Sequence, residues 1–330
     1  MSQSYDKHDQ KIIRVLRKVG LIAANKIAET LQGSIWRASP LSDESLNPKT
    51  IVIKVTNKYL QQNSLARIGK TTVPVYEDII SEAGILKYLS EDDKCPKSIV
   101  KFDRFFKTSK DYFLMMEDGG SSLFKFVTDA HKLIQLGKLE VSHWTKVAKI
   151  ISKQMLEAIE YIHSKNVCHF DLSLENFLIN DPNVEIERSG DIEKVRFITD
   201  DIQIKLCDFG LAKYFKEKKH CLSTKFCGKN NYKSPEVLNK KKKFDAKQND
   251  IWCLGVTLFM TCAGVAPWNL AHKSDETYVH MTNGFMKGLL KSWDVLDYVN
   301  DDLLNLFEAI FQDEAHRIPL AKIKVHPFMK

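Results

Sequence analysis

Two short polar motifs in the second half of the chain contain the residue types that phosphoryl transfer requires. Residues 169–176 read H-x-D-x-x-x-x-N, with Asp171 and Asn176 as the polar positions that follow the histidine. A carboxylate can accept the proton of an attacking hydroxyl group, and an amide oxygen can bind a divalent cation. The second motif is D-F-G at residues 208–210, and the carboxylate of Asp208 is a further oxygen ligand for Mg²⁺. Together the motifs indicate chemistry on a phosphoryl group.

The spacing of apolar residues predicts a β-rich first part and a helix-rich second part. Before residue 117, β-branched and aromatic residues predict three antiparallel strands within 25–55, a helix at 76–89, and two more strands at 99–106 and 112–116. The small, flexible sequence E-D-G-G-S-S follows at 117–122. Beyond it, apolar residues recur at helical spacing, as at 147–162 and 251–259. We therefore predict an α+β fold with a small, mostly β N-terminal lobe that has one helix and a large, mostly α C-terminal lobe.

Changes in composition suggest where these parts begin and end. We predict an N-terminal extension with a short amphipathic helix at 1–24, the N-terminal lobe at 25–116, a hinge at 117–122 and the C-terminal lobe at 123–330. Residues 180–203 lengthen the connection between the two polar motifs. We predict an extended hairpin or loop there, which is either surface decoration or a site for a partner.

Length and composition limit the class of protein. A chain of 330 residues exceeds the ~250–300 residues at which one hydrophobic core stops growing, which favours two lobes. No apolar run approaches the ~20 residues that span a bilayer, and the first residues are polar rather than signal-like. The seven cysteines are odd in number and form no C-x-x-C pair, so we expect free thiols in a reducing environment. These features predict a cytoplasmic protein without a signal peptide or transmembrane helix.

The positive charge of the chain is concentrated in one segment. The formal net charge is +7, and residues 211–247 contain twelve lysines against three acidic residues, so the rest of the chain is slightly acidic. A nucleic-acid-binding module is one alternative that such a patch allows, but few aromatic residues are interleaved with the lysines, and we expect no nucleic-acid partner. The lysines either attract acidic or phosphorylated substrates or form a solvated face.

In type and order, the motifs resemble those of eukaryotic protein kinases over roughly residues 25–330. The resemblance implies a bilobal fold, with ATP and Mg²⁺ as cofactors and proteins as substrates. It implies that Asp171 accepts the hydroxyl proton and that Asn176 and Asp208 bind Mg²⁺. Lys54, on the predicted third strand, matches the phosphate-binding lysine of the family, and Glu82, on the predicted helix, matches its ion-pair partner.

Further positions match the nucleotide-binding and activation segments of the family. The resemblance implies that the cofactor-binding residues are Ala28, Thr30, Gly33, Ile35, Lys54, Met116, Glu117, Gly119, Asn176 and Asp208. Residues 208–236 correspond to the activation segment, which contains Ser223 and Thr224 and ends in S-P-E. Glu236 of that motif corresponds to a glutamate that pairs with an arginine in the family, and here the matching arginine is Arg317.

Several positions depart from the pattern of the family. Gly33 alone remains of three glycines in the phosphate loop, so either the loop is stiffer or it tolerates small residues. Phe170 replaces an arginine that normally receives the activation-loop phosphate, which argues against loop phosphorylation as the main switch. Ser173 replaces a lysine and Lys229 replaces a threonine, so Lys229 either supplies the missing cation or is a solvated lysine. The changes are similar to those in divergent kinases of apicomplexan parasites, including the FIKK group, although the strand here reads V-I-K-V.

The resemblance implies a kinase that transfers the γ-phosphate of ATP to serine or threonine of protein substrates, with tyrosine left open. A catalytically weak pseudokinase scaffold is the alternative. The loss of loop glycines favours the scaffold. Retention of the five main site residues opposes it, and these are Lys54, Glu82, Asp171, Asn176 and Asp208.

Overall fold

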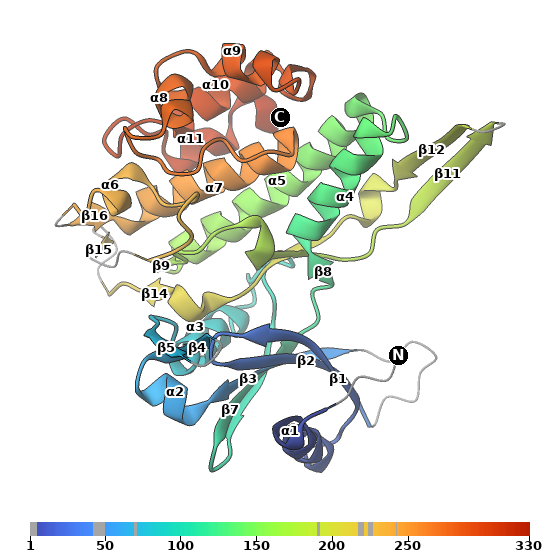
Figure 1. Ribbon diagram of the computed structural model, residues 1–330, viewed down its shortest axis with the longest axis vertical. Coiled ribbons are helices and arrows are strands. Elements are labelled where there is room, and N and C mark those ends of the chain that lie inside the picture. The colour runs from blue at the N-terminus through green and yellow to red at the C-terminus, as the bar shows by residue number, and fades with distance from the viewer. Residues whose placement is uncertain are drawn as a thin grey trace. The chain divides into compact units, whose positions relative to one another are not determined.

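The computed structural model describes residues 5–41, 50–68, 71–189, 192–216, 221–223, 227–241 and 243–330. The chain divides into two compact units (Figure 1), the first of residues 1–90 and 100–118 and the second of residues 91–99 and 119–330. The first unit is built mainly from strands and the second mainly from helices. The predicted α+β fold class is confirmed.

A five-stranded antiparallel sheet forms the centre of the first unit. In spatial order, its strands are β1 (Leu21–Thr30), β2 (Gly33–Pro40), β3 (Ile51–Asn57), β7 (Asp111–Glu117) and β6 (Phe102–Lys107). The strand that the sequence predicts from Ile99 begins only at Phe102. Ile99 instead forms an isolated parallel bridge with Leu206 of the second unit, to which it belongs.

The N-terminal helix α1 (Lys7–Lys18) packs on this sheet. Asp6 caps the helix, because its carboxylate accepts hydrogen bonds from the first backbone N–H groups. Ile12 and Leu16 are buried in one apolar cluster with Trp36 of β2. Strand β1 starts at Leu21, before the predicted lobe boundary at residue 25. The predicted extension is therefore continuous with the sheet of the first unit.

Between strand β3 and helix α3, the chain forms three short elements that the sequence pattern did not predict. They are α2 (Lys58–Gln62), β4 (Leu65–Ile68) and β5 (Thr71–Pro74), and they precede α3 (Ile79–Ser90). The β1–β2 turn is fastened to this insertion, because Gln32 Nε2 donates a hydrogen bond of 2.8 Å to the Leu65 carbonyl oxygen. Gln32 is buried, with 4% of its surface exposed.

Gly33, at the start of β2, lies against the backbone of β3. A Cβ atom at this position would lie 2.0 Å from the Val55 carbonyl oxygen. We expect Gly33→Ala to destabilise the first unit by about 1–3 kcal/mol, because strands β2 and β3 must separate to admit the methyl group. Thermal unfolding measures the effect.

The matched control for this change is Gly84→Ala in α3. An added Cβ there meets no atom within 4 Å. Alanine in an exposed helical position should stabilise the protein by roughly 0.5–1 kcal/mol. Equal melting temperatures for the two variants would show that Gly33 is not held by this contact.

The second unit has a core of long helices. Helices α5 (Val141–Ser164) and α7 (Ala246–Ala263) contact each other, and nearly all of α7 is buried. The remaining helices are α4 (Leu123–Gln135), α6 (Pro235–Leu238), α8 (Glu276–Thr282), α9 (Met286–Ser292), α10 (Asp301–Ile310) and α11 (Leu320–Lys324). None of the helices in the described part of the chain has the length and apolar composition of a membrane span.

Short strands of the second unit carry the polar motifs. One sheet has the order β13 (Ile204–Leu206), β10 (Phe177–Ile179) and β8 (Ser121–Ser122). Strand β9 (Val167–Cys168) pairs with β14 (Lys213–Tyr214), and β15 (Leu222–Ser223) pairs with β16 (Phe244–Asp245). The motif at 169–176 therefore lies between β9 and β10, and the D-F-G motif directly follows β13.

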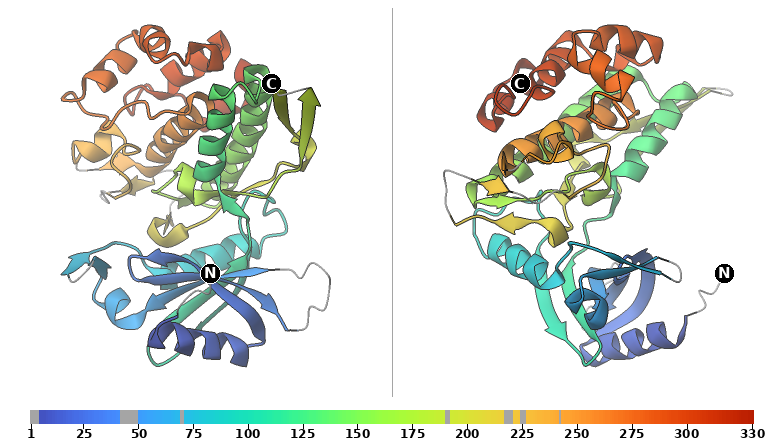
Figure 2. Two further views of the ribbon diagram at one scale, coloured as in Figure 1. Left: turned by 45° about the vertical axis from the view of Figure 1, so that its right-hand side comes forward. Right: turned by 60° about the vertical axis from the view of Figure 1, so that its left-hand side comes forward.

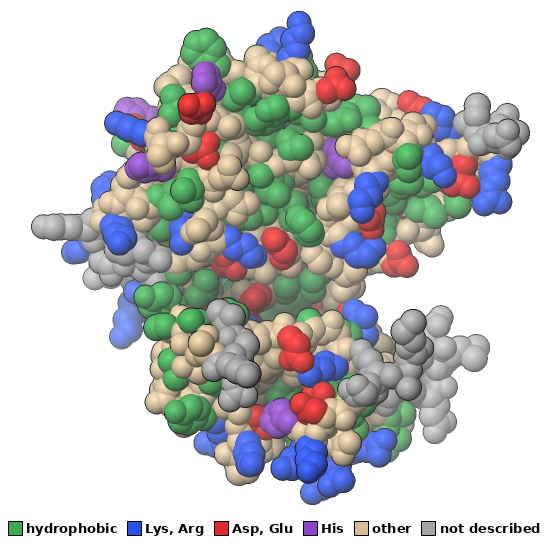
Figure 3. Space-filling view, in the orientation of Figure 1, with side chains coloured by type: hydrophobic (Ala, Val, Ile, Leu, Met, Phe, Trp, Pro, Cys, Tyr) green, Lys and Arg blue, Asp and Glu red, His purple; other side chains and the backbone are tan. Residues whose placement is uncertain are grey.

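Residues 180–203 contain a β-hairpin of β11 (Val184–Ser189) and β12 (Ile192–Phe197). The hairpin projects from the helices of the second unit (Figures 1 and 2). Its base is anchored to the loop between α4 and α5, because Val195 donates its N–H to the Lys138 carbonyl oxygen at 2.8 Å. Basic and acidic side chains are interspersed along it (Figure 3), and Glu193 of the hairpin forms an ion pair with Lys138 of that loop.

Candidate functional site

A buried ion pair joins strand β3 to helix α3 in the first unit. Lys54 Nζ lies 2.9 Å from Glu82 Oε2 and 3.8 Å from Glu77 Oε2. Only 7% of Lys54 and 2% of Glu82 are exposed. Because the surroundings exclude most water, the pair holds the ammonium group of Lys54 in one place.

Asp171 and Asn176 lie together at the start and end of one tight loop in the second unit. Asn176 Nδ2 donates hydrogen bonds to the Asp171 carbonyl oxygen at 2.7 Å and to Asp171 Oδ2 at 2.8 Å. Since the amide nitrogen is used in this way, the amide oxygen of Asn176 is the atom that a cation can bind. The same contacts hold the Asp171 carboxylate in a defined orientation.

Asp208 adjoins this loop through the pairing of β10 with β13. Cys207 donates its backbone N–H to the Asn176 carbonyl oxygen at 2.9 Å, so the residue before Asp208 is hydrogen-bonded to Asn176. Asp208 has a φ of 60°, and its Oδ1 accepts a hydrogen bond from the Gly210 N–H at 3.4 Å. A carboxylate and an amide oxygen on adjacent backbone segments fit the preference of Mg²⁺ for oxygen ligands.

Burial and nearby positive charge shift the pKa of the Asp171 carboxyl group in opposite directions. Burial raises the pKa of its carboxyl group above the ordinary value, and the nearby Lys229 and His169 lower the pKa. The net direction is upward. A carboxylate with a raised pKa is a stronger base, which suits a group that accepts a proton.

A buried carboxylate of α7 fixes the backbone in front of Asp171. Asp250 is fully buried and accepts hydrogen bonds from the N–H groups of His169 at 2.8 Å and Phe170 at 2.9 Å. It also contacts His163 Nε2 at 2.9 Å. Phe170 has a φ of 67°, a strained value for a large side chain, and the two bonds to Asp250 stabilise that conformation.

Another buried ion pair lies in the second unit. Arg317 Nη1 and Nη2 contact the two carboxylate oxygens of Glu236 at 2.7 and 3.1 Å. Arg317 also donates to the carbonyl oxygens of Gln248 and Gln312 and lies over the Trp252 ring. The pair anchors the end of the segment 208–236 to α7 and to the C-terminal helices.

Comparison with known proteins identifies the family. The family model for the protein kinase domain matches residues 44–329. The chain belongs to the protein kinase domain family. This kinase domain is 28% identical to serine/threonine-protein kinase CHK1 of Saccharomyces cerevisiae over 259 residues, which are 76% of this chain and 43% of the yeast protein.

Two further relatives have the same level of identity. Calcium-dependent protein kinase 3 of Plasmodium berghei is 28% identical over 295 residues, 88% of this chain and 46% of that protein. Serine/threonine-protein kinase SAPK9 of Oryza sativa is 28% identical over 238 residues, 71% of this chain and 56% of that protein. The kinase domain thus spans about half the length of these relatives. A particular relation to the apicomplexan FIKK group stays a prediction.

In the described part of the segment 208–236, Phe215 packs against apolar side chains of the second unit. Phe170 is 2% exposed and lies in one cluster with Phe215 and Phe244, at ring-centroid distances of 6.4 and 6.5 Å. Phe170 and its apolar neighbours thus occupy the position at which the family has an arginine. Ser223 is also buried, at 2% exposed, so it is not accessible to another enzyme in this conformation. Thr224 lies outside the described residues.

The remaining predicted nucleotide-binding residues lie on strands β1, β2 and β7 of the first unit and at the start of residues 119–330 of the second. Ala28 and Thr30 lie in β1, and Gly33 and Ile35 lie in β2, where Ile35 pairs with Lys54. Along the sheet, Met116 and Glu117 end β7. In the second unit, a Cβ at Gly119 would lie 2.7 Å from Leu178 Cδ1, so close packing accounts for this glycine.

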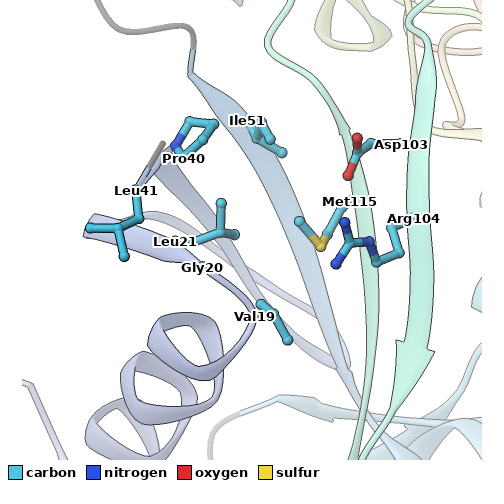
Figure 4. A pocket seen from close by; sticks show the side chains of 9 residues that line it. All are labelled: Val19, Gly20, Leu21, Pro40, Leu41, Ile51, Asp103, Arg104 and Met115. Carbon is cyan, nitrogen blue, oxygen red and sulfur yellow. The ribbon is translucent and has the colours of Figure 1, made fainter. Parts of the chain in front are cut away.

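A surface cavity of about 580 Å³ in the first unit contains none of these residues (Figure 4). Leu21, Ile51 and Met115 line it, together with Asp103 and Arg104 of β6. The cavity lies next to the end of α1 on the face of the sheet that the helix covers. The sequence analysis gave no signal for it, because its lining comes from residues far apart in the chain.

Proposed function

We propose that this kinase domain transfers the γ-phosphate of ATP to serine or threonine hydroxyl groups of protein substrates in the presence of Mg²⁺. The observation that carries the proposal is the hydrogen-bonded pair of Asp171 and Asn176 beside Asp208. The buried pair of Lys54 and Glu82 supports it, because removing a lysine from water is unfavourable. Phosphate binding during transfer explains why the chain keeps an oriented, buried lysine, and a scaffold without transfer does not. The kinase names of the relatives agree with it.

Asp171 acts as the base in the proposed reaction. Its carboxylate orients the substrate hydroxyl group and accepts the proton as the oxygen forms a bond to the γ-phosphorus. The bond between that phosphorus and the bridging oxygen breaks, and its electron pair leaves with ADP. Asn176 keeps the Asp171 carboxylate in position through its two hydrogen bonds.

The other site residues bind and orient the nucleotide. Asn176 and Asp208 would hold Mg²⁺, which neutralises phosphate charge when it is bound. Lys54, held by Glu82, would bind the α- and β-phosphates. The β1–β2 turn near Gly33 would cover the phosphates, and the backbone of residues 116–119 would bind the adenine edge.

The lysine-rich segment supports a preference for acidic or phosphorylated protein substrates. Its described lysines are Lys213, Lys216, Lys229, Lys233, Lys240, Lys241, Lys243 and Lys247. Lysines attract acidic peptides and repel basic ones. We also propose a cytoplasmic location, where the seven free cysteines would stay reduced.

Transfer to defined peptides tests the proposal. Purified protein is incubated with Mg-ATP and with pools in which serine, threonine or tyrosine is the sole acceptor, flanked by either acidic or basic residues. We expect transfer to the serine and threonine pools, faster with acidic flanks. Transfer to tyrosine alone would contradict the acceptor class. Nucleotide binding without transfer to any pool would favour the pseudokinase scaffold.

A further inference from the structure

The backbone of Gly228 brings Lys229 to the Asp171 loop. Gly228 has a φ of +96°, and a Cβ atom there would lie 2.9 Å from the Phe170 carbonyl oxygen and 3.7 Å from Asp171 Oδ1. Only glycine permits both this φ value and so close an approach. The next side chain along the chain, Lys229, therefore starts from a backbone position in contact with the loop that holds the proposed base.

The ammonium group of Lys229 lies among three groups of that loop. Its Nζ is 2.6 Å from Ser173 Oγ, 3.4 Å from Glu175 Oε2 and 3.8 Å from Asp171 Oδ2. Ser173 is fully buried, so its hydroxyl group is a fixed acceptor, whereas 36% of the Lys229 side chain is exposed. The ammonium group of Lys229 thus contacts a buried hydroxyl group, while the lysine side chain stays partly exposed to solvent.

A neighbouring lysine shows that this placement is specific. Lys233, one turn further along the same segment, is half-buried, and its ammonium group donates a hydrogen bond of 3.1 Å to Asn230 Oδ1. Lys229 contacts the base itself. A solvated surface lysine needs no hydrogen bond to a buried serine hydroxyl group. The contacts of Lys229 with Ser173 and Asp171 therefore favour a functional role over a solvated face.

We propose that Lys229 is a catalytic residue whose ammonium group binds the phosphoryl group during its transfer, and that Ser173 positions it. The inference rests on the proposed function and deepens it. As the acceptor oxygen forms its bond to phosphorus and the bond to ADP breaks, negative charge spreads over the phosphoryl oxygens, and a cation about 4 Å from the base stabilises that charge. The proton passes to Asp171, and Lys229 stays protonated throughout.

Variants of Lys229 that differ in charge test this inference. Lys229→Met keeps most of the aliphatic chain but removes the charge, and we expect it to lower kcat on the order of 10²-fold. Lys229→Arg keeps the charge and should recover most of the loss. Ser173→Ala removes the fixed acceptor and should lower kcat by about 3- to 10-fold. Lys324→Met, at an exposed lysine paired with Glu160, is the control and should behave as wild type.

The split between kcat and KM gives a second readout that a purely structural lysine would not move. Lys229 would bind charge that develops during the transfer, so Lys229→Met should lower kcat and leave the KM for the peptide nearly unchanged. Lys324→Met should change neither.

The outcomes separate this inference from the proposed function. If wild-type protein and Lys229→Met transfer phosphate at rates within a factor of about three, the role of Lys229 is wrong although the kinase activity stands. A Lys229→Met variant that raises the KM for the peptide and keeps the wild-type kcat would also overturn it. If the wild type itself transfers no phosphate, the proposed function fails first, and the inference falls with it.

Discussion

Asp171→Asn should lower the rate of phosphate transfer by about 10²- to 10⁴-fold, which is the usual contribution of a positioned general base. Asparagine has nearly the shape of aspartate, and its amide oxygen can still accept the hydrogen bond from Asn176 Nδ2. The change therefore removes the base and preserves the loop. Steady-state kinetics with a serine peptide and Mg-ATP measure the effect, and we expect it in kcat rather than in the KM for ATP.

The control for this change is Asp297→Asn, at an exposed aspartate of the second unit. It removes the same charge far along the chain from the proposed site and should leave kcat unchanged. A kcat for Asp171→Asn close to that of the control would show that Asp171 is not the base.

Arg317→Met should destabilise the protein by about 3–5 kcal/mol, because it leaves the buried carboxylate of Glu236 without its partner. The Arg317 side chain is fully buried, and Glu236 is 5% exposed. The variant also removes hydrogen bonds to two backbone carbonyl groups and the stacking on Trp252. Unfolding followed by circular dichroism against urea measures the change.

Two comparisons make the stability prediction specific. Arg317→Lys should also be strongly destabilised, since an ammonium group cannot make the two parallel bonds to Glu236. Lys324→Ala breaks an exposed ion pair with Glu160 and should change stability by less than about 1 kcal/mol. An Arg317→Met variant as stable as Lys324→Ala would contradict the account of this pair.

Much of the sheet of the first unit was predictable from the sequence because β3 is rich in β-branched residues and because β6 and β7 contain aromatic residues. The insertion from α2 to β5 was not, because each element has only four or five residues and no clear apolar period. Ile99 was assigned to a strand on its composition, but it pairs with Leu206, a partner more than a hundred positions away. Local pattern cannot reveal such a long-range bridge.

The proposed roles of the site residues came from the order of the motifs, whereas the surroundings of these residues could be described only from the structure. The contact of Lys54 with Glu82 joins residues on separate elements, and only the resemblance to a family suggested it before the structure placed them 2.9 Å apart. At Phe170 the sequence showed only a missing arginine. The structure shows an apolar cluster and a left-handed backbone there, and neither has a signal in a single sequence.

The most direct test of the central claim is mass spectrometry of a serine- and threonine-containing peptide pool after incubation with Mg-ATP and either the wild type or Asp208→Ala. The account predicts phosphorylated serine and threonine with the wild type and almost none with the variant, since Asp208 is a proposed ligand of Mg²⁺. A folded wild-type protein that binds nucleotide but adds no phosphate would contradict the account, as would equal phosphorylation by Asp208→Ala.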